Sequence, residues 1–352
     1  MAEKTTIYDL AESLQISVGT VYRALHGTGR ISPATKERVL QKAAEMNFEL
    51  NHSAQRLSRS PITIGVVLCC PIPEFLDEIY FGISHEFAAL AQYKFLSDIR
   101  IMPNKNAEDC SDLISEALYD FKEKKYGGVI LFLSGSHAPC SEALSALEDA
   151  NIPIVCLVND IPQKNRVSFV SADGFHAGRI AAELLSFTCT NQRVAILTGA
   201  SAIHIHKLNM AGFMEEAKNL FETVDVYEHQ DRPDLVRRQL SDIFNHTPSY
   251  HGLYITSASS IYACPLLVNL NSDRKMHIVT TDLFSQTKQP LDDRIVMATI
   301  FQNPFLQGRK AVKAIYSYLQ KQDHQSLVMI PPQIVLHSNA DLYHISATPE
   351  KD

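Results

Sequence analysis

The first 48 residues have the apolar spacing of short helices. Ile7, Leu10, Ala11 and Leu14 follow one another at intervals of three and four residues, as apolar side chains do on one face of a helix. These residues predict a first helix close to the N-terminus.

Two further helices are indicated by the residues that would begin them. Ser17 suits the N-cap of a second helix from Val18 to about Leu25. A loop with two glycines follows at 26–31. Ser32 and Pro33 then provide an N-cap and a proline at the first helical position of a third helix. We therefore expect residues 1–48 to form a small helical domain.

The pattern changes twice after this domain. Residues 49–61 are polar, end at Pro61 and contain too few apolar side chains to pack, so we expect a linker that can become a short helix with a suitable partner. From residue 62 onward, short β-branched runs alternate with amphipathic stretches.

This alternation predicts an α/β body. We expect eleven strands, at 63–68, 95–101, 128–133, 154–158, 168–170, 193–197, 223–227, 252–255, 277–280, 296–299 and 333–336. The clearest helices between them are expected at 78–91, 107–124, 175–187, 207–219, 233–244 and 304–319. Such alternation builds parallel sheets that are covered by helices on both faces, and about ten strands suggest two sheets. A ligand of this kind of fold binds at the carboxyl ends of the strands, here in the cleft between two lobes.

Composition is that of an ordinary globular protein. The 352 residues are 45% hydrophobic and suit about two or three domains. There is neither an apolar run of about 18 residues nor a basic start followed by an apolar stretch, so we expect no membrane span and no secretory signal. The seven cysteines form no Cys-x-x-Cys pair, which favours reduced, mostly buried thiols in a cytoplasmic protein.

Charge is distributed unevenly along the chain. Residues 1–61 hold eight Lys and Arg against six Asp and Glu, a net charge of +2, whereas the remaining residues have a net charge of −9. A mildly basic head on an acidic body is expected when only the head meets phosphate.

The sequence motifs do not support an enzyme. No G-x-S-x-G, phosphate-binding G-x-x-x-x-G-K-[ST] or G-x-G-x-x-G stands at a predicted strand–helix junction. His204 and His206 are expected on the loop before Asn209, but a metal site needs a third ligand that the sequence does not supply. We therefore predict no enzyme activity, no metal and no cofactor.

The second predicted helix has a face suited to the major groove of DNA. If Val21 faces the core, the opposite face carries Val18, Gly19, Tyr22, Arg23 and His26. An Arg can make a bidentate contact with guanine, and an apolar side chain can contact a thymine methyl. Gly19 costs the helix about 1 kcal/mol relative to Ala. Close approach to DNA would explain it, and the alternative is a neutral position that specifies little.

The same segment resembles the head of the lactose-repressor (LacI/GalR) family along its whole length. That family's pattern runs from Tyr-Asp-(Val/Leu)-Ala through Ser-x-x-Thr-Val-x-Arg to Ser-x-x-Thr-(Arg/Lys)-x-x-Val. Ten residues fall on it: Tyr8, Asp9, Ala11, Ser17, Thr20, Val21, Arg23, Ser32, Thr35 and Val39. The resemblance implies a helix-turn-helix domain that binds operator DNA.

The resemblance also assigns roles to individual residues. Base contacts are implied for Val18, Gly19 and Arg23. Contacts that mostly hold the phosphate backbone are implied for Thr6, Tyr8, Ser17, Thr20, His26, Arg30, Ser32 and Thr35. Ile7 and Tyr22 complete the expected DNA-binding set, although many relatives carry Ser at the position of Tyr22. Phosphate contacts position such a head, and base contacts specify the site.

The linker resembles the hinge helix of the family at Asn51, Ala54, Gln55 and Leu57. In that family the hinge helix forms on operator DNA and pairs with its twin in the minor groove, where a leucine unstacks the central base step. Leu57 is the matching residue. The alternative is that Leu57 only fills a linker, and Leu50 departs from the Pro that relatives often carry.

From about Thr63 to Leu336 the chain resembles the effector domain of the same family. Asp173, Gly178 and Ala181–Ala182 match its Asp-x-x-x-x-Gly-x-x-Ala-Ala spacing, and we expect Asp173 to cap the helix that follows. The resemblance implies a body of the periplasmic-binding-protein type I kind, each lobe a parallel sheet flanked by helices. Its expected division is an N-lobe at about 62–160 and 296–330, and a C-lobe at about 161–295 and 331–352.

Effector-binding residues can be carried over only by position. The expected set is Phe75, Asn159, Asp160, Asn209, Ser257, Asp282 and Gln302. Carboxylates and amides bind the paired hydroxyls of sugars and polyols, so a sugar or polyol is the expected effector. Asn209 stands where sugar-binding relatives usually carry Arg, which argues against a sugar acid.

These features favour a transcriptional regulator, most simply a homodimeric repressor on a near-palindromic operator. A solute-binding protein of a sugar transporter is the alternative that uses the same body, but it would need an export signal and no DNA affinity. A sugar-active enzyme with an accessory head would need a catalytic constellation.

Overall fold

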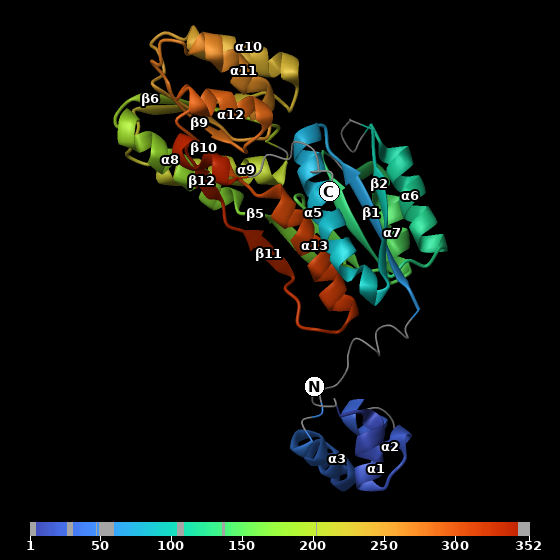
Figure 1. Cartoon of the computed structure of the whole chain (residues 1–352). Coiled ribbons are helices and arrows are strands. Elements are labelled where there is room, and N and C mark those ends of the chain that lie inside the picture. The colour runs from blue at the N-terminus through green and yellow to red at the C-terminus, as the bar shows by residue number, and fades with distance from the viewer. Residues whose placement is uncertain are drawn as a thin grey trace. The chain divides into compact units, whose positions relative to one another are not determined.

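The chain divides into two compact units, Met1–Ser60 and Pro61–Asp352. A computed structural model describes residues 5–26, 31–46, 48, 60–103, 109–135, 138–201 and 203–343. We refer to the two units as the head and the body, and we describe each by itself (Figure 1).

The head contains three helices among its described residues: α1 (Ile7–Leu14), α2 (Val18–His26) and α3 (Pro33–Glu45). They enclose a small core of Leu10, Ala11, Val21, Ala24, Val39 and Ala43. The predicted start of the third helix is confirmed, because the Ser32 side chain accepts a hydrogen bond from the Thr35 N–H and Pro33 occupies the first helical turn. The predicted helical head is therefore present.

The body contains two six-stranded sheets. The strands are β1 (Ile62–Cys69), β2 (Phe95–Ile101), β3 (Gly128–Leu133), β4 (Ile154–Leu157), β5 (Arg166–Ala172), β6 (Arg193–Thr198), β7 (Thr223–Glu228), β8 (Gly252–Ile255), β9 (His277–Thr281), β10 (Ala298–Phe301), β11 (Leu327–Ile330) and β12 (Gln333–Val335). The first sheet has the order β11-β5-β4-β3-β1-β2, and the second has the order β12-β10-β9-β8-β6-β7. Neighbouring strands are parallel except for β10 and β12, which are antiparallel.

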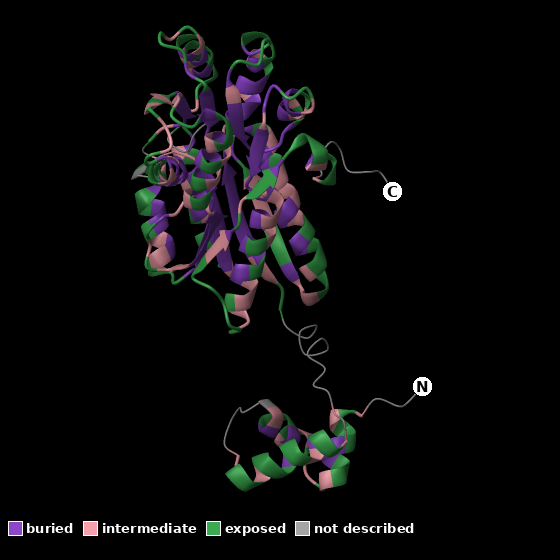
Figure 2. Cartoon of the chain, turned by 90° about the vertical axis from the view of Figure 1, so that its left-hand side faces the viewer, coloured by how far each residue is buried: buried purple, intermediate pink, exposed green. Residues whose placement is uncertain are grey.

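Helices cover both sheets. They are α5 (Pro73–Leu90), α6 (Ser111–Glu123), α7 (Ser141–Asp149), α8 (Gly174–Cys189), α9 (His204–Glu216), α10 (Pro233–Phe244), α11 (Ser260–Leu270), α12 (Ser285–Asp292) and α13 (Pro304–Leu319), with short 3-10 helices at η1 (Ala91–Tyr93), η2 (Ala138–Cys140) and η3 (His337–Leu342). Central strands such as β3 are buried along their whole length, as expected of a strand that is covered on both faces. Figure 2 shows the buried residues concentrated in the two sheets.

The sheets define two lobes whose boundaries differ from our expectation. β5 was expected in the C-lobe but belongs to the first sheet, and β10 was expected in the N-lobe but belongs to the second. The physical reason is pairing: β5 lies between β4 and β11, whereas β10 pairs with β9 and β12. β11 was not predicted, because its short apolar run lies at the edge of the sheet and ends before two prolines.

The chain crosses three times between the lobes: after β5, after β10 and between β11 and β12. The first lobe therefore contains the first sheet with α5, α6, α7 and α13, and the second lobe contains the second sheet with α8 to α12. Asp173 caps α8 at the first crossing, as predicted, since its carboxylate accepts from the His176 N–H.

Two glycines let α8 and α9 approach closely. A Cβ on Gly178 would lie 1.9 Å from the Asn209 carbonyl oxygen, and a Cβ on Gly212 would lie 1.9 Å from the Phe175 carbonyl oxygen. Only glycine fits at such a distance between helix backbones. This packing fixes the helix that carries Asn209.

Candidate functional site

The exposed face of α2 carries the side chains expected to contact bases. Tyr22 is 42% exposed, and the Arg23 guanidinium is exposed and lies 3.4 Å from the Thr20 hydroxyl. Gly19 has open space around it, since a Cβ there would meet nothing closer than the Ser17 hydroxyl at 3.9 Å. Val18, which we expected on the same face, is half-buried and packs against the head core.

Both α2 and α3 begin with the same Ser-x-x-Thr arrangement. The Ser17 hydroxyl accepts from the Thr20 N–H at 3.2 Å and contacts the Thr20 hydroxyl at 2.8 Å. Ser32 and Thr35 repeat these contacts at 3.1 Å and 2.7 Å. Helix N-termini with small polar caps bind phosphate well, because their N–H groups and dipoles favour negative charge.

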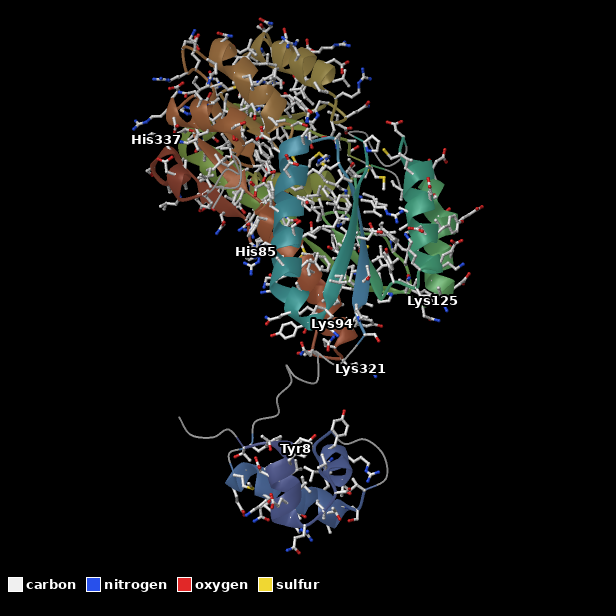
Figure 3. The ribbon with its side chains drawn as sticks, turned by 45° about the vertical axis from the view of Figure 1, so that its right-hand side comes forward. Tyr8, His85, Lys94, Lys125, Lys321 and His337 are labelled. Atoms are coloured by element: carbon white, nitrogen blue, oxygen red, sulfur yellow. The ribbon has the colours of Figure 1, made fainter. Side chains whose placement is uncertain are left out.

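Three of the predicted DNA-binding residues, Thr6, Ile7 and Tyr8, lie at the start of α1. The Thr6 hydroxyl caps the helix and donates to Asp9 at 2.7 Å, and these hydrogen bonds lower the pKa of Asp9. Ile7 packs against the head core, whereas Tyr8 is 70% exposed on the head surface (Figure 3). The side chain of His26 and all of Arg30, Asn51, Ala54, Gln55 and Leu57 lie outside the described residues.

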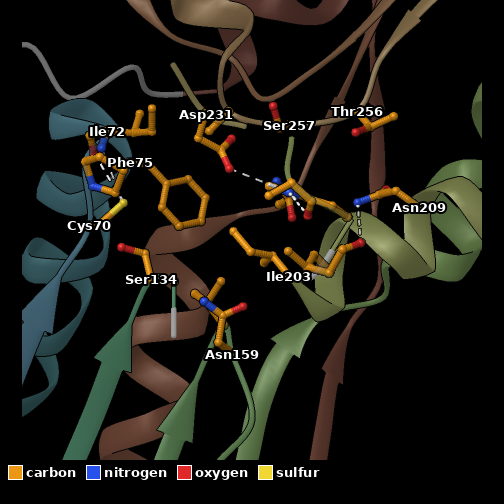
Figure 4. Close-up of a pocket in the computed structure, with 18 of the residues that line it drawn as sticks. Cys70, Ile72, Phe75, Ser134, Asn159, Ile203, Asn209, Asp231, Thr256 and Ser257 are labelled. Atoms are coloured by element: carbon orange, nitrogen blue, oxygen red, sulfur yellow. Dashed lines mark hydrogen bonds and ion pairs between the residues drawn. The ribbon is translucent and has the colours of Figure 1, made fainter. Parts of the chain in front are cut away.

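The body contains a cavity of about 590 Å³ between its two lobes (Figure 4). It lies at the carboxyl ends of β1, β3 and β4 in the first lobe and of β6, β7, β8 and β10 in the second. This is where a ligand of a doubly wound fold is expected. Five of the seven effector-binding residues that we predicted line it: Phe75, Asn159, Asn209, Ser257 and Gln302.

The wall from the first lobe is mainly apolar. Cys70, Ile72, Phe75, Phe132 and Val158 supply most of it. The Phe75 ring points into the cavity (Figure 4) and meets the Phe132 ring edge to face at 6.0 Å between centroids. Burial raises the pKa of the Cys70 thiol to about 12, so this thiol stays protonated and unreactive.

The wall from the second lobe carries the charged and polar groups. Asp231 lies after β7 and accepts a hydrogen bond from the Ser259 hydroxyl at 3.3 Å. The His206 Nδ1 is 3.7 Å from the Asp231 carboxylate and 3.2 Å from the Ala200 carbonyl oxygen. Gly199 makes room for this pair, because a Cβ there would lie 2.1 Å from the His206 ring.

His229 lies behind this wall and forms hydrogen bonds with two of its residues, Asp231 and Ser257. It is fully buried, and its Nδ1 accepts from the Asp231 backbone N–H at 3.1 Å. Nδ1 therefore carries no proton, so the proton is on Nε2, which donates to the Ser257 hydroxyl at 3.3 Å. Burial lowers the pKa of His229 to about 4, which agrees with a neutral ring.

Three of the four amide side chains that line the cavity donate their N–H groups to the protein. Asn159 donates to the Leu133 carbonyl oxygen at 3.0 Å. Asn209 donates to the Ile205 carbonyl oxygen at 3.0 Å and accepts from the Tyr254 hydroxyl. Gln302 donates to Asp282 at 2.7 Å. Because a carbonyl or carboxylate oxygen only accepts, these partners fix which way each amide is turned.

Asp160 and Asp282 do not line the cavity, contrary to our expectation. The Asp160 carboxylate lies 3.2 Å from Arg166 Nε, so it pairs with the start of the next strand. Asp282 is fully buried beneath Gln302, whose backbone N–H and side-chain amide both donate to it. Burial raises the pKa of Asp282 to about 7.

Several lining residues escaped the sequence analysis, among them Ser134, His206, Gln230, Asp231 and Thr256. His206 was expected on a loop but lies in the first turn of α9. Asp231 lies three residues beyond the end of β7, in the loop where the rule that ligands bind at strand ends places candidate residues.

Left-handed backbone conformations gather at the cavity. Val158, Gln230 and Asp231 have φ values of 66°, 51° and 56°. A β-branched residue such as Val rarely adopts this conformation, which costs on the order of 1–3 kcal/mol. The surrounding structure holds these turns in place.

Within the described part of the chain, no helix is long and apolar enough to cross a membrane. In the same residues no group of three or more His, Cys, Asp or Glu is arranged to hold a metal ion. His206 lies 3.7 Å from the Asp231 carboxylate, whereas His229 contacts the Asp231 backbone N–H.

Two family models match the chain. Residues 6–51 match the model of bacterial regulatory proteins of the lacI family. Residues 109–323 match the model of the periplasmic binding protein domain. The two matches fall on the head with the linker and on the body.

Curated relatives are regulators by name. The chain is 31% identical over 222 residues to the HTH-type transcriptional regulator DegA of Bacillus subtilis, which covers 61% of this chain and 62% of that protein. It is 27% identical to the catabolite control protein A of Priestia megaterium over 48% of this chain and 47% of that protein. The chain thus spans about half to three fifths of the length of these relatives. The ribose operon repressor of Bacillus subtilis is 23% identical over 90% of this chain and 92% of its own.

Solved structures resemble the body in fold. GanP, a glucose-galactose binding protein from Geobacillus stearothermophilus, has a TM-score of 0.69 at 20% identity over 80% of this chain and 99% of its own. An ABC transporter periplasmic solute binding protein from Actinobacillus succinogenes with bound D-allose has a TM-score of 0.68 at 17% identity over 81% of this chain and 100% of its own. At such identities the likeness concerns the fold alone.

Proposed function

The chain belongs to the lacI family of bacterial regulatory proteins and carries a periplasmic binding protein domain, and on this premise we propose that it is a DNA-binding transcriptional regulator. Its affinity for an operator would be controlled by a small molecule in the cavity of the body. More specifically, we propose a homodimeric repressor that acts in the cytoplasm.

One observation carries the proposal: the exposed face of α2 combines Tyr22, Arg23 and the unobstructed Gly19. An exposed Tyr beside an Arg contributes little to the stability of the head in water. These groups do match base edges in the major groove. The N-termini of α2 and α3 lie close to these residues in the sequence, and their N–H groups can bind DNA phosphates.

Control by a small molecule is supported by the position of the cavity. Its walls come from both lobes, so a ligand that contacts both favours one lobe arrangement over another. Such a ligand changes DNA affinity by its coupling free energy, which is typically about 1–3 kcal/mol and acts in both directions. A sugar or polyol, the effector we expect from the family resemblance, and a near-palindromic operator belong to the proposal.

Selection of DNA from a random library with the full chain tests the DNA-binding function. We expect enrichment of a near-palindrome, because a two-fold dimer matches a two-fold site. Arg23→Ala should relax the preference at one base pair of each half-site, at a cost of about 1–3 kcal/mol. Arg237→Ala, an exposed arginine on α10 of the body, is the matched control and should leave the preference unchanged.

Failure to enrich any sequence would overturn the proposal and favour a solute-binding protein. An enriched site whose sequence preference survives Arg23→Ala would instead remove Arg23 from the base contacts. Leu57→Ala addresses the hinge hypothesis: it should weaken specific binding more than non-specific binding, and equal losses would contradict a leucine wedge.

A further inference from the structure

Among its described lining residues the cavity contains one carboxylic acid, one histidine, His206, and neither lysine nor arginine. Asp231 is the acid. Arg232, the next residue, is turned away, since its guanidinium donates to Asp234 at 3.2 Å and 2.6 Å. The negative charge of Asp231 is therefore not balanced by an arginine or lysine of the wall.

The two histidines near Asp231 differ, because His229 supplies no positive charge whereas His206 lies within ion-pair distance of the carboxylate. His229 is neutral because its Nδ1 accepts the Asp231 N–H. His206 places its Nδ1 closer to the Ala200 carbonyl oxygen, at 3.2 Å, than to the Asp231 carboxylate, at 3.7 Å. A hydrogen bond from Ser259 is the remaining contact of the carboxylate.

The amides add acceptors to this carboxylate. Asn159 uses its N–H group on Leu133, and its Oδ1 is buried with no partner among the described residues. Gln302 uses its N–H group on Asp282, so its Oε1 is the part of the amide left for a ligand. The Ser257 hydroxyl already accepts two hydrogen bonds and can donate. Gln230 and Thr256 can both donate and accept, so Asp231 is the lining group that most needs a donor from the ligand.

A buried acceptor that stays unpaired is costly, and a carboxylate forms its strongest hydrogen bonds with charged donors. We propose that the effector is a compact organic cation with a protonated amino group on Asp231. A further N–H or O–H group of the effector donates to Gln302, and its hydrocarbon part lies against Phe75. This inference rests on the proposed function, since it assigns the chemical class of the ligand that this function requires.

The test compares probes that differ in charge and little else. The first set is D-glucosamine, D-glucose and D-glucuronate, and the second is putrescine, butane-1,4-diol and succinate. Each probe is titrated into the full chain by isothermal calorimetry, with the thermal shift of the protein as a second readout. We expect the amine of at least one set to bind about tenfold or more tightly than its neutral counterpart, and the anion to bind weakest.

Asp231→Asn keeps the shape of the side chain and removes its charge. We expect it to lower the affinity for the amine by about tenfold or more and to leave the neutral probe within about threefold of wild type. Asp242→Asn, an exposed residue on α10, makes the same change outside the cavity and should leave both affinities as they are. The charge order of the probes on the wild-type protein tests the proposal even if Asp231→Asn fails to fold.

A small-molecule extract of bacterial cells widens the test beyond these six probes. It is separated into the fractions retained by a cation exchanger, retained by an anion exchanger and retained by neither. We expect the cation-exchanger fraction to raise the melting temperature of the wild type, and Asp231→Asn to lose this shift.

Three results would overturn the inference. They are a neutral or anionic member that binds best in every set in which binding is detected, a thermal shift confined to the neutral or anionic fraction, and no shift from either amine or from the cationic fraction. None of these touches the DNA selection described above. If an operator is enriched but one of these three results is obtained, this inference is wrong and the proposed function still holds.

Discussion

The two walls of the cavity differ in how their side chains are held. The wall of the first lobe presents Phe75 and Phe132, which are held by apolar packing. The wall of the second lobe presents Asp231 and Ser257, which are held by hydrogen bonds to Ser259 and His229. The hydrogen bonds that hold Asp231 and Ser257 all come from the second lobe. A ligand can therefore be recognised there by hydrogen bonds and then be covered by the apolar surface of the first lobe.

The largest effect is expected from breaking the apolar wall. Phe75 is 4% exposed, and Phe75→Ala should reduce the free energy of unfolding by about 3–5 kcal/mol, because it removes a buried ring and leaves a cavity. Denaturant unfolding followed by circular dichroism measures this. Phe187→Ala on α8, where the ring is 73% exposed, should change stability by less than about 0.5 kcal/mol. Equal losses in the two variants would contradict the described burial.

A smaller loss of stability is expected from the polar wall. Ser257→Ala removes the acceptor for the His229 Nε2–H, and this buried donor then has no partner among the described residues. Leaving a buried donor unpaired costs about 1–3 kcal/mol, again measured by denaturant unfolding. Ser272→Ala, an exposed serine after α11, makes the same change on the surface. If Ser257→Ala is as stable as this control, the hydrogen bond does not contribute to the free energy of unfolding.

The polar wall and the layer beneath it should respond to pH in opposite directions. Burial lowers the pKa of His229 to about 4 and raises that of Asp282 to about 7. Between about pH 4 and 6.5 the unfolded chain holds more protons at His229 than the folded chain, so this group makes stability rise with pH. Over the same range the folded chain holds more protons at Asp282, so that group makes stability fall as pH rises.

Single variants separate these two contributions. Relative to wild type, His229→Gln should make stability fall more steeply with pH, and Asp282→Asn should make it rise more steeply, each by at most about 1.4 kcal/mol per pH unit. Unfolding curves at several values between about pH 4.5 and 6.5 measure the slopes. His251→Gln, at an exposed position, should keep the wild-type slope. Parallel slopes in all four proteins would show that neither buried group titrates as described.

The smallest effect on stability is expected where the lobes touch beside the cavity. Ser285 on α12 donates through its N–H and its hydroxyl to Glu74 on α5, at 3.1 Å and 2.8 Å. Glu74→Gln should cost less than about 1 kcal/mol, because the contact is exposed. Small-angle scattering should show a body that is more open without ligand. A scattering curve identical to that of wild type would show that this contact does not hold the lobes together, and Glu116→Gln on α6 is the control.

Periodicity predicted most of the fold because burial repeats along the chain. The buried strands were found from apolar spacing, and the starts of α3 in the head and α8 in the body were found from Ser32 and Asp173. β11 escaped because an edge strand of four residues has little apolar pattern.

The cavity was predicted only in part, since lining depends on where each loop turns after its strand. Asp160 and Asp282 follow strands, but the first pairs with Arg166 and the second is buried beneath Gln302. Asp231 reaches the cavity through a left-handed turn, and apolar spacing carries no signal for such a turn.

The three crossings between the lobes have a consequence for folding during synthesis. Once β10 has been made, each sheet has five of its six strands, but the first sheet still lacks the helix α13 that covers it. Domains generally fold as units as the chain emerges. The second lobe, with Asp231 and its hydrogen bonds, can therefore form on the ribosome before the lobe whose first strand was made earlier. The residues from 304 to 330 then complete the first lobe, and β12 adds the edge strand of the second sheet after them.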